Sequence, residues 1–323
     1  MNPTLQAVTA RGWRDVWLLA LVSLIADVSG EMVLALLPIV LVAQGASGIG
    51  IGLVDGVTEG VGHLFKYIGA QVGARVKRQR LLIGSGYMVA ALARFGVAFA
   101  TTWPLTLASR SLDRVGKGIR TAPRDAMLAR LIESGQRARA YGLHFAGDTM
   151  GGVIGVLLVL LFISGLGWTT KSVVIFGSFI GLFAIIPLFW VRDRLATPGE
   201  APEIVEPPSP SYGPFLAVSA LFSLGRLSYM FYIVRILGLY GSVAVGILFY
   251  LLFNVMQAAS AVKWGRTADR IGKSTILAVG FFLFALAPAV FILTDHLLGL
   301  VAGITLLGLA LACVESTGRA LAA

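Results

Sequence analysis

Carboxylates recur at helical spacing inside long apolar stretches of this chain, where ionised side chains are rare. Asp27 and Glu31 lie four residues apart, and Asp148 follows His144 by the same interval, so each pair shares one face of a helix. Glu59 lies in a further apolar stretch. Carboxyl groups within a membrane span can exchange protons and mark functional sites. We therefore predict that Asp27, Glu31, Glu59 and Asp148 bind protons or another coupling cation.

Simpler roles are open to some of these polar residues. Asp55 lies where its span would meet the outer surface, and Glu59 could form a structural pair with Lys66. His63 and His144 belong to separate stretches, and two histidines on different helices are too few to define a metal site. The sequence therefore predicts neither a metal ion nor a cofactor.

The most highly charged stretch, residues 108–129, reads ASRSLDRVGKGIRTAPRDAMLA. Its charged residues recur at steps of three and four, which places them on one face of a helix. We predict that this face is the inner wall of a solute path and attracts an anionic or zwitterionic solute. The residues assigned to the wall are Arg110, Asp113, Arg114 and Lys117. The basic residues from position 120 onward have an alternative interpretation, as topological charges at the cytoplasmic interface.

Polar residues are fewer within the apolar stretches of the second half. Tyr229, Asn254 and Gln257 lie there at positions suited to hydrogen bonds with a small polar solute. Hydrogen bonds between neighbouring helices would account for the two amides equally well. We assign all three residues to the predicted solute path.

Hydropathy indicates which elements must position these residues. The 323-residue chain is 57% hydrophobic and 13% charged, whereas a soluble domain is about 45–50% apolar and about 25% charged. We predict an all-α integral membrane protein, because the apolar runs reach the ~20 residues that cross a bilayer. Ten runs qualify: 16–43, 49–70, 81–100, 104–129, 140–165, 172–191, 214–237, 242–262, 274–293 and 298–322. The single cysteine excludes an internal disulfide framework.

Basic residues predict the orientation. They precede the first span and follow the even-numbered spans, whereas the loops after odd-numbered spans contain few basic residues besides Lys171. This alternation places the amino terminus and the loops after even-numbered spans in the cytoplasm. It also accounts for the net charge of +10 without a nucleic-acid partner. Residues 193–213 are rich in proline and acid and resemble a cytoplasmic linker. The predicted organisation is a six-span bundle over 1–192, this linker, and a four-span bundle over 214–323.

The turn between the eighth and ninth spans contains Gly265, Asp269, Arg270, Gly272 and Lys273. By these residues, which match the loop signature G-x-x-x-D-R-x-G-R/K, the chain resembles the major facilitator superfamily. The resemblance implies that this turn gates the transport cycle. It also implies a two-bundle fold with six spans in each half.

Three further stretches extend the resemblance over nearly the whole chain. The first-half copy of the signature has Gly73 where the family has an aspartate. The sequence GDTMGGVIG, at 147–155, resembles the antiporter motif of exporter branches, with Gly152 in place of a proline. Residues 108–129 resemble the fourth helix of a branch with the pattern D-R-x-G-K-G-x-R-x-x-P-R-D. The likeness of residues 147–155 to the antiporter motif implies an antiporter, and export is the direction typical of those branches; the sequence itself leaves import and export open.

The two copies of the loop signature and the linker between the bundles together favour a secondary active transporter that works by alternating access. We expect a monomer in the cytoplasmic membrane that contacts lipid, a small polar solute and a proton or other coupling ion. A non-transporting receptor or assembly protein on the same scaffold is the alternative. A membrane enzyme acting on phosphate or lipid head groups is less favoured, because no nucleophile and base lie at usable spacing.

The two predicted halves differ in length. The first half contains six spans and the second only four, and the sequence stops within an apolar run. Since family members have twelve spans, we expect this chain to be a truncated product that lacks two helices. Polar surface left without partner helices is poorly tolerated in lipid, so we expect deficient transport or stability.

Overall fold

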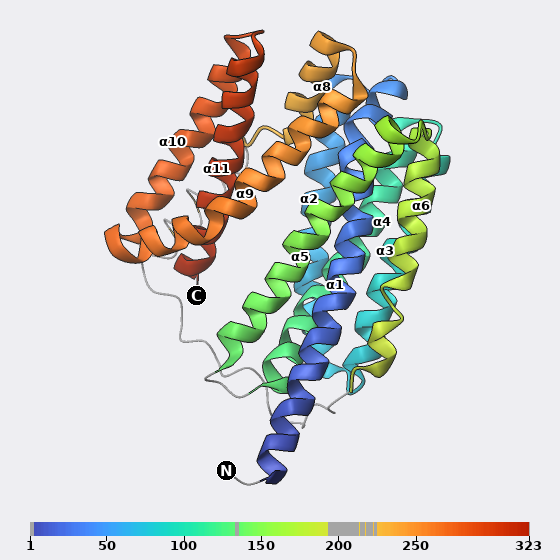
Figure 1. Cartoon of the computed structure of the whole chain (residues 1–323), viewed down its shortest axis with the longest axis vertical. Coiled ribbons are helices and arrows are strands. Elements are labelled where there is room, and N and C mark those ends of the chain that lie inside the picture. Colours follow the sequence, from blue (N-terminus) through green and yellow to red (C-terminus); the bar gives the residue numbers. More distant parts are fainter. Residues whose placement is uncertain are drawn as a thin grey trace. The chain divides into compact units, whose positions relative to one another are not determined.

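The computed structural model describes residues 3–132, 136–192 and 225–322, together with Gly213, Ala217 and Phe222. These residues are helical apart from short turns, and the chain divides into two compact units, Met1–Ala201 and Pro202–Ala323 (Figure 1). The all-α membrane fold predicted from the sequence is confirmed. Of the predicted linker at 193–213, all but Gly213 lies outside the described residues.

In the described part of the first unit, long helices follow one another with short turns between them. They are α1 (Pro3–Ala43), α2 (Gly48–Arg75), α3 (Gln79–Phe99), α4 (Trp103–Leu131), α5 (Arg137–Leu160) and α6 (Thr170–Phe183). Helix α5 continues into a π-helical turn at Leu161–Gly165, and a 3₁₀ turn at Pro187–Trp190 follows α6. Ser47 and Thr169 cap α2 and α6 by accepting hydrogen bonds from backbone N–H groups. Helix α1 packs on α5 and α6, and α4 packs on both α2 and α3.

The described part of the second unit contains α8 (Tyr229–Tyr240), α9 (Val243–Ile271), α10 (Lys273–Ile292) and α11 (Leu297–Ala322). Helix α11 packs on α9 and α10. The thiol of Cys313 is buried in this packing and donates a hydrogen bond to the carbonyl oxygen of Ile276 at 3.2 Å. The seventh predicted span, 214–237, is described continuously only from Gly225, and its helix extends to Tyr240.

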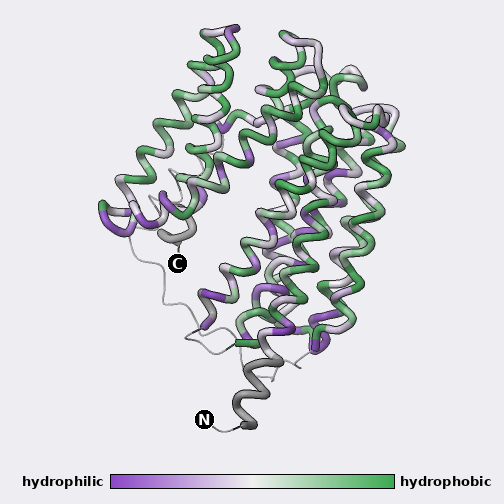
Figure 2. Tube along the Cα trace, in the orientation of Figure 1, coloured by the Kyte–Doolittle hydropathy of each residue, from purple (hydrophilic) through white to green (hydrophobic). Residues whose placement is uncertain are grey.

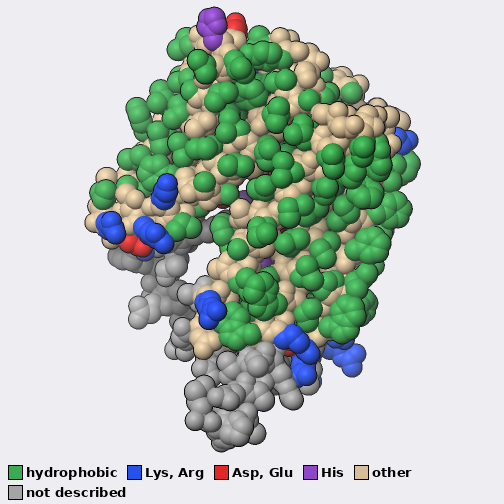
Figure 3. Space-filling model, in the orientation of Figure 1, with side chains coloured by type: hydrophobic (Ala, Val, Ile, Leu, Met, Phe, Trp, Pro, Cys, Tyr) green, Lys and Arg blue, Asp and Glu red, His purple; other side chains and the backbone are tan. Residues whose placement is uncertain are grey.

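Seven of the described helices are long and apolar enough to cross a membrane. They are α1, α3, α5, α6, α9, α10 and α11. Figure 2 shows hydrophobic residues along most of their length, and Figure 3 shows a face covered mainly by hydrophobic side chains. Helices α2 and α4, with 28 and 29 residues, have sufficient length, but polar and charged residues lower their hydropathy. The charged side chains of these two helices therefore need partners inside the unit.

A line of glycines on α5 allows a close approach to α1. A Cβ atom on Gly147, Gly151 or Gly155 would lie 2.5–2.9 Å from a carbonyl oxygen of α1. Real Cβ atoms essentially never come this close, so these positions require glycine. The glycines belong to the GDTMGGVIG motif. The motif therefore has a packing role in this structure, at the helix face that carries Asp27 and Glu31.

Candidate functional site

Helix α4 contributes most of the charged side chains of the candidate site. It begins at Trp103, and Pro104 lies in its first turn. Proline is tolerated there because backbone N–H groups of the first turn have no partner within the helix. The helix continues through Pro123 to Leu131. Its cations pair with carboxylates of α1 and α2, and its Asp113 pairs with an arginine of α3. One helix therefore contacts three others through opposite charges.

Two arginines share one carboxylate in the interior of the first unit. Asp113 accepts hydrogen bonds from Nε of Arg94, at 3.2 Å, and from Nη1 of Arg110. Arg94 also donates to the hydroxyl of Ser29 at 2.7 Å and to the carbonyl oxygen of Ala26 at 3.2 Å. We call Arg94, Arg110 and Asp113 the deep trio, because their side chains are only 2–5% exposed. The trio joins α1, α3 and α4 from within.

Arg94 was not assigned a role from the sequence. It is the only charged residue between Leu81 and Leu107, and no charged neighbour at helical spacing indicated a function. Its isolation could have indicated a role, because a lone arginine in a membrane span needs a partner. The same burial places Arg110, which we predicted to line the path, inside the helix packing.

Arg114 pairs with Glu59 of α2 through Nη2 and Oε1. The partner suggested by the sequence for Glu59 was Lys66, but this lysine is exposed, and the structure places the carboxylate of Glu59 against α4 instead. The two residues are close because α2 and α4 pack tightly. A Cβ atom on Gly118 would lie only 2.8 Å from the backbone of α2. Glycine therefore allows the contact between the two charged helices.

Lys117 and Asp27 form a looser pair between α4 and α1. The ammonium nitrogen lies 3.8 Å from Oδ1 of the carboxylate, near the limit of an ion pair. The Lys117 side chain is 46% exposed and that of Asp27 is 19% exposed. We call these two residues the accessible pair. Both side chains are more exposed than those of the deep trio, and Lys117 more so than Asp27.

Two further arginines of α4 are also held inside the unit. The guanidinium carbon of Arg120 lies 3.7 Å from the ring centroid of Tyr87, and the side chain is buried. Arg124 donates to the hydroxyl of Ser23 at 2.9 Å and to the carboxylate of Asp125. Basic residues that only mark a cytoplasmic loop would lie in solvent. Burial of Arg120 therefore disagrees with the topological interpretation of this residue.

The remaining predicted coupling residues lie along the seam between α1 and α5. Glu31 is partly buried, and its Cβ atom would be 3.1 Å from a Cβ on Gly155. Asp148 lies 3.3 Å from Nδ1 of His144 on the same helix, and its side chain is 31% exposed. Asp27 and Glu31 thus lie next to the glycines of α5 that contact α1. The structure brings the coupling residues of α1 and α5 to one helix–helix contact.

The predicted path residues of the second unit have partners within that unit. Tyr229 stacks on Phe253, with ring centroids 6.0 Å apart. The amide of Asn254 donates to the carbonyl oxygen of Tyr250 in its own helix at 2.9 Å. The amide of Gln257 lies 3.4 Å from the carboxylate of Glu315 on α11, as expected for a hydrogen bond between neighbouring helices.

The signature turn lies where α9 meets α10. Gly272 has a φ of +114°, a conformation that side chains rarely adopt, and its N–H donates to the carbonyl oxygen of Ala268. Asp269 and Arg270 are exposed in the last turn of α9, and α10 begins at Lys273. Gly265 lies within α9. The five signature residues thus occupy the final turns of one helix and the start of the next.

The first-half copy of the signature departs from the family for a steric reason. A Cβ atom on Gly73 would lie 2.7 Å from the ring of Pro123 on α4. An aspartate at this position would not fit without moving α2 away from α4. Glycine at position 73 therefore allows the tight packing of these two helices.

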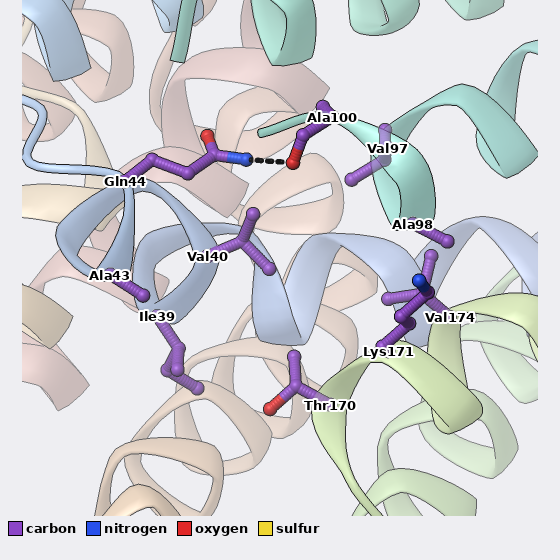
Figure 4. Close-up of a pocket in the computed structure, with 10 residues that line it drawn as sticks. All are labelled: Ile39, Val40, Ala43, Gln44, Val97, Ala98, Ala100, Thr170, Lys171 and Val174. Atoms are coloured by element: carbon purple, nitrogen blue, oxygen red, sulfur yellow. Dashed lines mark hydrogen bonds between the residues drawn. The ribbon is translucent and has the colours of Figure 1, made fainter. Parts of the chain in front are cut away.

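The structure also contains a shallow pocket at the turn end of α1, α3 and α6 (Figure 4). It has a volume of about 230 Å³ and mostly aliphatic walls, with Lys171 and Thr170 at one side. Gln44 donates to the carbonyl oxygen of Ala100 beside it. Among the described residues, no group of three or more His, Cys, Asp or Glu side chains could hold a metal ion.

Membrane-length helices in two units, with opposite charges paired inside one of them, occur in secondary transporters. The chain belongs to the Major Facilitator Superfamily, whose sequence profile matches residues 19–323. It is therefore a multi-pass membrane transporter and not an enzyme.

Individual relatives agree with this assignment. An uncharacterised MFS-type transporter of Methanocaldococcus jannaschii is 28% identical over 84% of this chain and 71% of its own length. The chloroplastic ascorbate transporter of Arabidopsis thaliana is 27% identical over 32% of this chain and 18% of its own length. The crystal structure of a mutant of the nucleoside transporter NupG matches with a TM-score of 0.74 at 14% identity, covering 95% of this chain and 82% of that one. At this identity the structural likeness concerns the fold alone.

Proposed function

We propose that this transporter exchanges a small zwitterionic or anionic solute for protons across the cytoplasmic membrane, with its amino terminus in the cytoplasm. The proposed direction is export. The accessible pair is the observation that carries this proposal, because it presents one cation and one carboxylate, 3.8 Å apart, to the surface of the first unit.

The chemistry of the accessible pair is complementary to a zwitterion. The anionic group of the solute would bind Lys117, and its cationic group would bind Asp27, so that the solute replaces the contact between the two side chains. A proton on Asp27 would neutralise the carboxylate and compete with the cationic group. Competition of this kind couples solute exit to proton entry, because Asp27 carries one or the other in each half of the cycle.

The neighbouring charges have supporting roles in the proposal. Arg114 lies one turn from Lys117 on α4, and its planar guanidinium suits a carboxylate or phosphate group of the solute. Glu59, Glu31 and Asp148 are further proton-binding candidates. An anionic solute is also supported by the partial match to a protein named as an ascorbate transporter. We propose that the transporter acts as a monomer.

Orientation is supported by the distribution of basic residues. Arg75, Lys77 and Arg78 lie at the end of α2 and just after it, whereas the start of α6 carries Lys171 alone among the described basic residues. Arg and Lys near the ends of spans remain on the cytoplasmic side. The signature turn between α9 and α10, with its exposed Arg270, would then face the cytoplasm and gate the path from that side.

Transport by the purified chain in sealed proteoliposomes tests the proposal. A panel of labelled zwitterionic and anionic solutes would be tried with and without a pH gradient. Asp27→Asn should abolish gradient-driven transport, because the amide keeps the shape of the carboxylate and cannot change charge. Exchange of an anionic solute should remain measurable, because such a solute has no cationic group for Asp27 to bind. Lys117→Gln should weaken solute binding at least ten-fold, the order expected for loss of a charge-assisted contact.

Asp295→Asn is the matched control, since it removes one carboxylate from an exposed pair in the second unit. It should transport like the unaltered chain. Gradient-driven transport that persists unchanged in both Asp27→Asn and Lys117→Gln would exclude the accessible pair from coupling. Solute binding without any transport would favour the receptor alternative instead.

A further inference from the structure

A second cavity lies between α1 and α5, at the end of the first unit where α5 begins. It has a volume of about 410 Å³ and is lined by Trp13, Trp17, Arg139 and Leu143. From Trp17 to Asp27 is ten residues along α1, or about 15 Å at the rise of an α-helix. The cavity is therefore separate from the accessible pair, and the proposed transport mechanism does not use it.

The side chains around this cavity combine a cation with two indole rings. The guanidinium carbon of Arg139 lies 4.9 Å from the ring centroid of Trp13, and the arginine is exposed. Trp13 is held in place because its indole N–H donates to the side-chain oxygen of Gln136 at 3.0 Å. Trp17, one turn further along α1, is 61% exposed. Among the described carboxylates, none forms an ion pair with Arg139.

The location favours a particular class of ligand. Tryptophan is enriched where membrane helices meet lipid head groups, and arginine there attracts anionic lipids. The same end of the first unit carries the basic residues at the end of α2, and Figure 3 shows Lys and Arg side chains gathered near it. A basic pocket between membrane helices on the cytoplasmic side suits an anionic head group.

We propose that this cavity binds the phosphate of an anionic phospholipid from the cytoplasmic leaflet. Arg139 donates to the phosphate oxygens, Trp13 fixes the direction of the guanidinium, and Trp17 and Leu143 contact the glycerol and upper acyl chain. The leaflet assignment rests on the proposed cytoplasmic amino terminus. The lipid site itself depends on no step of the transport cycle.

Lipid retention by the purified full-length chain tests this proposal directly. Protein is extracted from vesicles containing equal amounts of phosphatidylglycerol and phosphatidylcholine, and the lipids that remain bound are counted by native mass spectrometry. Arg139→Gln should lower phosphatidylglycerol retention about five-fold, the change expected for about 1 kcal/mol per arginine near an anionic membrane. Arg139→Lys should keep most of the retention, since the positive charge remains.

Arg78→Gln is the matched control, because it removes an exposed positive charge from the same end of the unit but outside the cavity. It should retain as much phosphatidylglycerol as the unaltered chain. Trp17→Ala should lower retention of the lipid without changing the net charge. Equal retention by Arg139→Gln and Arg78→Gln would overturn the proposal, and so would equal retention of the two lipids.

Two additional measurements distinguish a lipid site from a site for soluble phosphate compounds. Inorganic phosphate, added at increasing concentration, should leave the bound phosphatidylglycerol in place. Displacement by phosphate alone would identify a site for soluble phosphate compounds and contradict the lipid assignment. Phosphatidylglycerol confined to one leaflet of oriented vesicles should be retained only from the leaflet facing the amino terminus. None of these measurements involves transport. They therefore test the lipid site even if the proposed transport function is wrong.

Discussion

Two groups of paired charges lie within about one turn of each other on α4 and differ chiefly in burial. In the deep trio, Asp113 lies between Arg94 and Arg110, and the side chains are 2–5% exposed. In the accessible pair, Lys117 is 46% exposed and its distance to Asp27 is 3.8 Å. Both groups join basic side chains to an aspartate.

We expect the difference in burial to separate a structural role from a functional one. A buried charge that loses its partner is poorly solvated, so breaking the deep trio should be costly. A partly exposed charge can exchange its partner for water, a proton or a solute at small energetic cost. The comparison predicts that stability depends on the trio, whereas transport depends on the pair.

Asp113→Asn should have the largest effect on stability. It leaves two buried guanidinium groups with no carboxylate between them, and loss of a partner from a buried ion pair destabilises a protein by about 3–5 kcal/mol. Thermal unfolding of the purified variant in detergent should show a much lower midpoint than that of Asp27→Asn. Similar midpoints for the two variants would remove the distinction between the trio and the pair.

A combined variant sharpens this test. Replacing Arg94 and Arg110 by Met and Asp113 by Leu removes all three buried charges together. Since apolar residues of similar volume often replace a buried ionic group without loss of stability, the midpoint should recover most of the decrease seen for Asp113→Asn. A combined variant that is less stable than Asp113→Asn would indicate that the hydrogen bonds from Arg94 to α1 dominate.

Gly151→Ala should have an intermediate effect. The added methyl group would lie 2.5 Å from the carbonyl oxygen of Leu24 and 3.2 Å from the Cβ atom of Asp27, so α5 must move away from α1. Overpacking of this kind destabilises by about 1–3 kcal/mol, and it should also displace Asp27 from Lys117. Unfolding and transport assays would both detect the change. Gly142→Ala on the same helix meets nothing within 4 Å and should be neutral or slightly stabilising.

Lys117→Gln should lower stability far less than Asp113→Asn, because the Lys117 side chain is 46% exposed and its contact with Asp27 is long at 3.8 Å. The same variant should be strongly impaired in solute binding. Unfolding midpoints and solute affinity, measured on one preparation, report the change in stability and the change in solute binding. A large loss of stability together with unchanged affinity would reverse the assignment of the pair.

Asp295→Asn should have the smallest effect, between about 0 and 0.5 kcal/mol on unfolding, because solvent screens an exposed pair. Asp295 is 70% exposed and pairs with Arg235 in the second unit. Its unfolding midpoint sets the baseline for the loss of one carboxylate. A decrease as large as that of Asp113→Asn would show that burial does not govern these effects.

Much of the fold could be predicted because hydropathy and turn residues act locally. The predicted spans at 49–70, 81–100 and 104–129 correspond to α2, α3 and α4, whose observed ends lie within a few residues of the predicted ones. The spacing of charges on α4 predicted one polar face. Gly272 could be predicted as part of a turn since it belongs to the signature, and its positive φ accounts for the glycine.

Partner choice within the site could not be predicted, because it depends on contacts between helices. Glu59 pairs with Arg114, which is 55 residues away in the sequence, and not with nearby Lys66. Arg120 rests on Tyr87 of another helix, which a charge pattern along one helix cannot indicate. Periodicity identifies the face on which a charge lies, but packing of the helices determines what it meets.

The burial of Cys313 makes the protein suitable for spectroscopy with site-specific labels. It is the only cysteine in the chain, its side chain is inaccessible, and its thiol is occupied by a hydrogen bond to Ile276. Thiol-reactive spin labels or fluorophores would therefore attach only at cysteines introduced deliberately on exposed positions. Distances between labels on the two units could then be followed through the transport cycle without replacing any native residue in the core.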